Sequence, residues 1–285
     1  MDKEYSIMDD INNINLFINK LKKNKENNPN ALKKKEIAFA ISLKSKKVSR
    51  NWLQVQMNLA KTLKSIFNNT NQNYRIIIVG HEKPNIKELK HKRVTWLKAH
   101  FPSPNGINKY SNDKLRKREI IGKHLRKIGF SGYFMALDAD DWIHHRFVEL
   151  IMLHPHRDAL ILNKGFMLNL FKNEIWPRSE FYRICGSSVI LYFSNYDFPK
   201  SLKRKDVRAS YFQLAVKPHP KVIDYLKEIK RQYSLMHLPI VVWVVAHGDN
   251  NSIMKKRFNH NVSAGDYNIA GSKINSSLFD QYRVK

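Results

Sequence analysis

A short apolar run that ends in three carboxylates constrains this chain most. Residues 133–137 are apolar and follow Gly132, which predicts a short buried β-strand. Asp138, Asp140 and Asp141 come next, so they fall at the carboxyl end of that strand, the edge where open α/β sheets bind ligands. Carboxylates this close repel one another unless a cation or hydrogen-bond donors offset their charge, and Mg²⁺ and Mn²⁺ prefer such ligands. An Asp-rich turn can equally cap the next helix, so the surroundings must decide.

Strand, helix and strand alternate before this run. Residues 37–43 and 74–79 have the apolar, β-branched character of buried strands, and residues 93–97 predict a weaker one. Between the first two, apolar residues from Trp52 to Ile66 recur at three- and four-residue steps, as on one face of a helix. This order predicts an α/β fold with a mainly parallel central sheet flanked by helices, Rossmann-like in its crossovers.

Later segments predict three more strands. Two short ones, at 159–163 and 165–171, are expected to form a hairpin that turns at Lys164 and Gly165. A long apolar run, 238–246, predicts a strand that leads directly into His247.

The chain divides by composition into three parts. Residues 1–35 predict an amphipathic helix and a basic linker, 36–253 the α/β domain, and 254–285 a basic tail over the surface. The helix could lie on a membrane, because lysines flank its apolar stripe, but packing on its own domain is the favoured prediction.

Charge and cysteine content limit the classes of function. A net charge of +27 indicates anionic partners: nucleic acid, phosphorylated small molecules or an anionic membrane surface. Cys185 is the one cysteine, which excludes a disulfide framework and a cysteine-based zinc cluster and fits the cytoplasm. We find no secretory signal, no run of membrane-spanning length, no Walker loop and no Gly-x-Ser-x-Gly elbow.

Several side chains elsewhere could serve a ligand at the same sheet edge. Glu82 follows the second strand and could accept hydrogen bonds from a nucleobase or ribose, or be a solvated loop residue. Asp113 and Lys117 lie one turn apart on a strongly basic helix and could contact a nucleotide and its phosphate. The Gly186–Ser188 turn suits close approach to a sugar or phosphate, or it is an ordinary tight turn, and His247 could be a metal ligand or a structural histidine.

Together these features resemble the GT-A glycosyltransferases, which use nucleotide-sugar donors. The resemblance covers residues 36–253 and rests mainly on the Asp138-Ala139-Asp140-Asp141 turn. The Gly186–Ser188 turn and His247 follow in the order in which that fold places a glycine-containing loop and a histidine ligand. The chain looks most like bacterial enzymes that transfer hexoses during synthesis of capsule, lipopolysaccharide or other surface polysaccharide.

The resemblance implies a metal site. Asp138 would approach the ribose or the metal, and Asp140 would bind the Mn²⁺ or Mg²⁺ ion that bridges the donor's diphosphate. His247 would complete that coordination.

The resemblance also implies a donor and acceptor pocket. Ser42 and Glu82 would line the nucleoside site, while Asp113 and Lys117 would hold its far side. Residues 186–188 would border the transferred sugar and the acceptor.

An inverting enzyme of this kind needs a carboxylate that takes a proton from the acceptor hydroxyl. No clear Glu-Asp pair stands between Ser188 and His247, where such a fold often carries the base. The candidates are Asp206, then Glu180 and Asp249. A retaining mechanism would need no such base.

Two other functions stay open at this stage. The same aspartates could serve a metal-dependent phosphohydrolase or nuclease, and the net charge could serve a nucleic-acid-binding protein. Nucleic acid is disfavoured because the cations are spread along the chain without interleaved aromatics. As a transferase, the chain is expected to act on a glycan or lipid-linked glycan acceptor, peripherally on the inner face of the plasma membrane.

Overall fold

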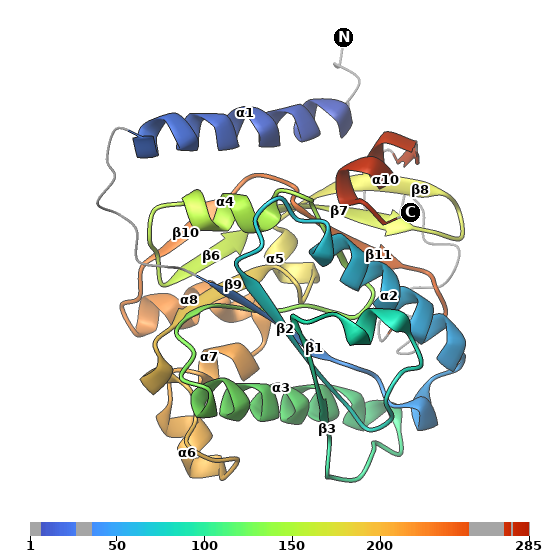
Figure 1. Ribbon diagram of the computed structural model, residues 1–285, viewed down its shortest axis with the longest axis vertical. Coiled ribbons are helices and arrows are strands. Elements are labelled where there is room, and N and C mark those ends of the chain that lie inside the picture. The colour runs from blue at the N-terminus through green and yellow to red at the C-terminus, as the bar shows by residue number, and fades with distance from the viewer. Residues whose placement is uncertain (1–6, 27–35, 251–270, 275, 285) are drawn as a thin grey trace.

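The computed structural model describes residues 7–26, 36–250, 271–274 and 276–284. A seven-stranded sheet forms its centre (Figure 1). The strands are β1 (Ile37–Ser42), β2 (Tyr74–Gly80), β3 (Val94–Lys98), β4 (Gly132–Ala136), β6 (Ala159–Leu162), β9 (Val189–Phe193) and β10 (Tyr233–Met236). Their order is β10-β6-β9-β4-β1-β2-β3, and all neighbours are parallel except β9, which is antiparallel to both β4 and β6. The predicted α/β fold with a mainly parallel sheet is confirmed.

Helices cover both faces of this sheet because successive residues of a strand point to opposite sides. Phe39 and Ile41 of β1 belong to one core cluster, together with apolar residues of α1 (Ile7–Glu26), α2 (Trp52–Phe67) and α4 (Phe147–Leu153). Ala38 and Ala40 belong to the opposite cluster, with residues of α3 (Tyr110–Lys127), α7 (Gln213–Val216) and α8 (Val222–Glu228). Figure 1 shows α3 on one side of the sheet and α4 on the other. The short helices α5 (Phe181–Ile184) and α6 (Arg204–Ala209) complete the connections after β8 and β9.

A second sheet of five strands lies beside the first. Its order is β12-β8-β7-β11-β5, with β5 (Trp142–Ile143), β7 (Lys164–Asn169), β8 (Glu174–Ser179), β11 (Val241–Val245) and β12 (Ser272–Lys273). The predicted hairpin at Lys164 and Gly165 is therefore wrong. β6 and β7 belong to different sheets, and the hairpin partner of β7 is β8, where Phe166 lies opposite Pro177. A proline within a segment disfavours the prediction of a strand there, and β8 contains Pro177. The sequence therefore does not predict β8.

The described helices nearest the two ends of the chain pack on the domain. Ile14 and Ile18 of α1 are fully buried, and the helix contacts α4, so the favoured prediction for it is confirmed. Near the other end, α10 (Ser276–Tyr282) buries Leu278 and Tyr282, and the Tyr282 hydroxyl donates to the Pro239 carbonyl at 2.6 Å. The proposed boundaries at 35/36 and 253/254 touch segments outside the described residues and stay predictions. Among the described helices, none is long and apolar enough to cross a membrane.

Candidate active site

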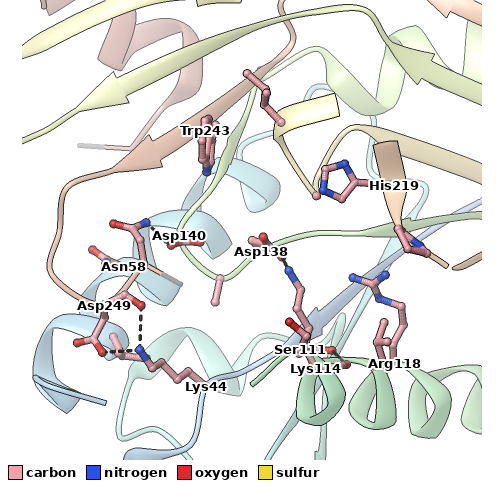
Figure 2. A pocket seen from close by; sticks show the side chains of 18 of the residues that line it. Lys44, Asn58, Ser111, Lys114, Arg118, Asp138, Asp140, His219, Trp243 and Asp249 are labelled. Carbon is pink, nitrogen blue, oxygen red and sulfur yellow. Dashed lines mark hydrogen bonds and ion pairs between the residues drawn. The ribbon is translucent and has the colours of Figure 1, made fainter. Parts of the chain in front are cut away.

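A cavity of about 480 Å³ opens where β1, β4 and β11 end at their carboxyl edges (Figure 2). Side chains from all three strand ends reach it, as expected for a ligand site of an α/β fold. Its wall combines both signs of charge. The acidic residues are Asp138, Asp140 and Asp249, the basic ones are Lys44, Lys114, Arg118 and Lys217, and two histidines, His219 and His247, stand among them.

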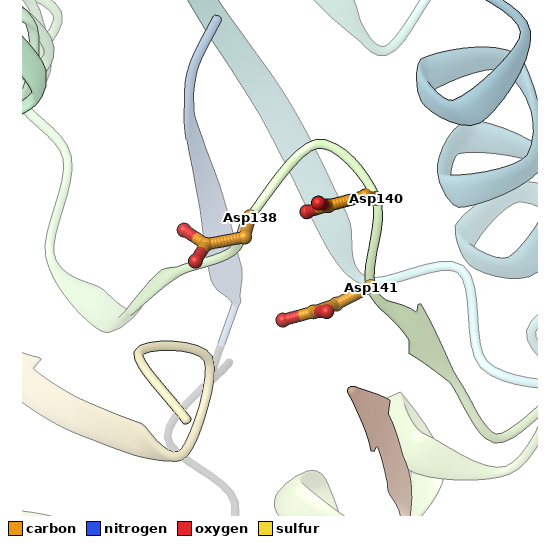
Figure 3. A group of neighbouring side chains, drawn as sticks. All are labelled: Asp138, Asp140 and Asp141. Carbon is orange, nitrogen blue, oxygen red and sulfur yellow. The ribbon is translucent and has the colours of Figure 1, made fainter. Parts of the chain in front are cut away.

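The aspartate turn forms one wall. It closes on itself because the Asp141 amide donates to the Asp138 carbonyl at 3.2 Å. Asp138, Asp140 and Asp141 each offer a carboxylate oxygen within 4.8 Å of the others (Figure 3). Asp138 and Asp140 line the cavity, whereas Asp141 is fully buried behind them.

Ser187 ties the two ends of this turn together. Its hydroxyl donates to Asp141 Oδ2 at 2.6 Å and accepts from the Asp138 amide at 2.9 Å. The other oxygen of Asp141 accepts from the Val244 amide of β11 at 3.2 Å. Burial raises the pKa of Asp141 well above its usual value, and the negative charges of Asp140 and Asp138 raise it further. Asp141 therefore supports the turn, and Asp138 and Asp140 are the carboxylates that face the cavity, where a ligand can reach them.

The chain turns sharply after β11 and places His247 beside Asp140. Ala246 and Gly248 both have left-handed backbones, with φ of 63° and 87°. Such a conformation costs a non-glycine residue about 1–2 kcal/mol, so the contacts around the turn must hold Ala246 in it. His247 Nε2 lies 2.6 Å from Asp140 Oδ2, and the Asn250 amide donates to the same oxygen at 3.2 Å.

These residues fit a divalent cation. Two cavity-facing carboxylates and an imidazole are ligands that Mn²⁺ accepts, and oxygen ligands also suit Mg²⁺. Burial is the larger cause of the raised pKa of Asp141 and the crowding of negative charge adds to it; a bound cation would relieve the crowding. Asp138, Asp140 and His247 would hold the ion. Their roles stay predictions.

Asp249, a candidate base, also lines the cavity but is held by three donors. Lys44 Nζ lies 2.8 Å from its Oδ1, and the amides of Arg50 and Asn51 donate to it at 2.9 and 3.0 Å. Burial raises the pKa of Asp249, but these hydrogen bonds outweigh it and lower the pKa overall. Asp249 thus fixes the start of α2 and positions Lys44.

Two of the residues predicted for the nucleoside site come from the ends of β1 and β2. Ser42 lines the cavity, and its hydroxyl donates to the Lys114 carbonyl at 3.0 Å. Glu82 does not line it. Its carboxylate accepts from the Lys46 amide at 2.8 Å and from the Ser45 hydroxyl at 3.2 Å, so it shapes the loop after β1.

Asp113 and Lys117 also lie one layer behind the wall. Lys117 is fully buried, and its Nζ donates to Asp113 Oδ2 at 2.6 Å and to the Leu43 carbonyl at 2.7 Å. The pair therefore anchors the loop that carries Lys44, and neither side chain lines the cavity.

The remaining predicted residues lie in the cavity wall, in the interior or near the surface. Gly186 lines the cavity, while the buried Ser188 hydroxyl donates to the Cys185 carbonyl at 2.6 Å. Two candidate bases lie elsewhere: Asp206 on α6 accepts from Ser201, and Glu180 is an exposed residue paired with Arg183. Neither Asp206 nor Glu180 lines the cavity.

Sequence reasoning missed the basic wall. Lys114 and Arg118, one turn apart on α3, face the cavity, and Lys114 Nζ lies 2.5 Å from Asp138 Oδ1 (Figure 2). Lys217 and His219 approach from the segment between α7 and α8. The four-residue spacing of Lys114 and Arg118 was the available signal, but α3 carries several other cations.

No family model matches this sequence, and no curated protein matches it. Several solved structures are similar to parts of this chain. TarS of S. aureus is 12% identical with a TM-score of 0.43, and the match covers 87% of this chain and 42% of that one. HddC of Yersinia pseudotuberculosis is 12% identical with a TM-score of 0.38, and the match covers 71% of this chain and 89% of that one. The glycosyltransferase GlyE of Streptococcus pneumoniae TIGR4 is also 12% identical with a TM-score of 0.38, and the match covers 82% of this chain and 62% of that one. The chain thus spans less than half of TarS, and a likeness this distant leaves the function to be argued from the cavity.

Proposed function

We propose that this chain is a metal-dependent glycosyltransferase of the GT-A type, which moves a hexosyl group from a nucleoside-diphosphate donor to a glycan acceptor. The observation that carries the proposal is one cavity with Asp138, Asp140 and His247 on one wall and the cations of α3 on another. A bound divalent cation would neutralise the diphosphate and make it a better leaving group.

The chain's own cations would act on the same diphosphate. Lys114 and Arg118 present an ammonium and a guanidinium to the cavity, and Lys217 adds a third positive charge. Arg118 anchors one nitrogen on the Ala215 carbonyl at 2.5 Å. Cations fixed before the reaction stabilise charge that develops on a leaving group without further reorganisation. An acidic site facing cations suits a metal–diphosphate complex better than it suits a bare metal or a bare anion.

The proposed acceptor class and cellular role rest on features outside the cavity. The resemblance to bacterial enzymes of surface-polysaccharide synthesis and the net charge of +27 favour a glycan or lipid-linked glycan at an anionic membrane. Helix α1, on the outside of the molecule in Figure 1, exposes Leu16 (66%) and Phe17 (38%) near the exposed Lys20. An apolar pair beside lysine suits the interface of an anionic bilayer. Co-sedimentation with phosphatidylglycerol vesicles at low salt tests this, and wild-type protein that stays in the supernatant would contradict it.

Donor cleavage tests the proposed reaction. Wild type and Asp140→Asn are incubated with uridine-, guanosine- and cytidine-diphosphate hexoses in Mn²⁺, and the released nucleoside diphosphate is measured. We expect release by wild type, and its loss by about 100-fold or more in the variant. Asp224→Asn, an exposed carboxylate on α8, is the matched control and should keep full activity. Release of inorganic phosphate or cutting of nucleic acid, without sugar transfer, would favour a hydrolase instead.

A further inference from the structure

His219 is held in a single orientation in the cavity wall. It begins a short 3-10 turn between Pro218 and Pro220, whose rings restrict the backbone on both sides. Its Nδ1 lies 2.6 Å from the Tyr182 carbonyl oxygen. A carbonyl oxygen only accepts hydrogen bonds, so Nδ1 must carry the proton. Nε2 of the neutral ring is then the nitrogen with a lone pair.

The lone pair of Nε2 is available to a ligand. In the described part of the chain, the one hydrogen bond of the ring is that of Nδ1. Figure 2 shows the ring on the cavity wall with Asp138 on one side and Arg118 on the other. His219 thus lies near Asp138, one of the carboxylates proposed to hold the metal ion.

The groups around the ring keep it neutral. Burial lowers the pKa of His219, and the positive charges of Lys114 and Arg118 lower it further. The Tyr182 carbonyl and the charge of Asp138 act in the opposite direction but do not cancel this. A neutral imidazole at physiological pH can accept a proton, whereas an imidazolium cannot.

The other candidate bases are occupied or distant. Both oxygens of Asp249 accept hydrogen bonds, and its lowered pKa makes it a weaker base. Asp206 and Glu180 do not line the cavity. His247 shares its Nε2 with Asp140 and belongs to the proposed metal site.

We infer that His219 is the catalytic base of the transfer, an inference that rests on the proposed function. His219 Nε2 takes the proton of the acceptor hydroxyl as its oxygen bonds to the anomeric carbon of the sugar. The bond from that carbon to the diphosphate oxygen breaks, and the nucleoside diphosphate leaves with the electron pair. Attack opposite to the leaving group inverts the anomeric configuration.

The test uses water as the acceptor and the same panel of nucleotide hexoses. His219→Gln should lower donor hydrolysis by about 100- to 10,000-fold and remove the fall of the wild-type rate at acid pH. Nucleoside-diphosphate affinity in Mn²⁺ should change by less than about twofold, because His219 does not hold the donor. Added imidazole should restore activity to His219→Gly, which a purely structural role would not allow. His100→Gln, an exposed histidine outside the cavity, is the control.

The outcomes separate the two proposals. Inverted sugar released by wild type, seen by NMR, together with imidazole rescue supports His219 as the base. Full hydrolysis by His219→Gln, or a retained anomeric configuration, overturns the inference and leaves the donor site standing. A wild-type protein that binds and cleaves no member of the panel overturns both.

Discussion

Replacing Ser187 with alanine tests how the aspartate turn is held. Ser187 is fully buried, donates to Asp141 Oδ2 at 2.6 Å and accepts from the Asp138 amide at 2.9 Å. The substitution leaves Asp141 Oδ2 with only the weak Cys185 thiol donor at 3.5 Å and leaves the Asp138 amide without its partner, and each loss costs about 1–3 kcal/mol. We expect Ser187→Ala to lower the free energy of unfolding by about 2–6 kcal/mol.

The neighbouring serine provides a matched control. Ser188 is equally buried, but its hydroxyl makes one hydrogen bond, to the neutral Cys185 carbonyl. Ser188→Ala should therefore cost about 0.5–1.5 kcal/mol. At about 2 °C per kcal/mol for a chain of this size, thermal unfolding should separate the two variants by several degrees.

The turn also carries the proposed metal ligands, so the two variants should differ in function. Ser187→Ala should weaken Mn²⁺-dependent binding of nucleoside diphosphate by about tenfold, equivalent to 1.4 kcal/mol. Ser188→Ala should leave that affinity unchanged. Equal destabilisation by both substitutions, or unchanged nucleotide affinity in Ser187→Ala, would refute the bridging role of Ser187.

Two further predictions concern charged side chains that do not line the cavity. Burial raises the pKa of Glu149, but hydrogen bonds from Arg146 and Lys22 outweigh it and lower the pKa from 4.5 to about 2. Because the pKa of Glu149 is lower in the folded than in the unfolded protein, its charge stabilises the fold fully above about pH 4.5. This stabilisation is lost as the pH falls towards 2. Urea unfolding should show that Glu149→Gln costs about 1–3 kcal/mol at pH 7, and a cost that persists undiminished at pH 3 would be inconsistent with this ion-pair network. Lys117→Met leaves Asp113 buried without its lysine partner and should lower the free energy of unfolding by about 3–5 kcal/mol. The double variant Lys117→Met, Asp113→Leu should recover most of that stability. A double variant that recovers none of it would argue against a buried ion pair.

The strands and the acidic turn could be predicted because their signals are local. The apolar run of β1, the β-branched run of β2 and the apolar run before Asp138 lie in the predicted strands. Only a few crossovers between strands are allowed, which limits the possible strand orders. The carboxyl ends of strands that are far apart in sequence can therefore meet at one edge of the sheet. That is why Asp140 and His247, which are 107 residues apart in sequence, are neighbours in the fold.

The basic wall and the supporting residues could not be predicted because they depend on side-chain direction across elements. Helix α3 carries cations on all sides, and only packing against β1 shows that Lys117 points inward while Lys114 faces the cavity. Glu82 and Asp113 have the residue type of ligands, yet they satisfy backbone and lysine donors in the loop after β1. His219 stands between two prolines, and the sequence around it has no motif that predicts a functional role.

The central claim is that the cavity binds a nucleoside diphosphate together with a divalent cation. Titration calorimetry of uridine, guanosine and cytidine diphosphates, with and without Mn²⁺, tests it most directly on wild type and Asp140→Ala. We expect one of the three to bind wild type tightly only with Mn²⁺, and Asp140→Ala to lose this binding while Asp224→Asn keeps it. Folded wild-type protein that binds none of them, or binds one equally well without metal and in Asp140→Ala, would contradict it.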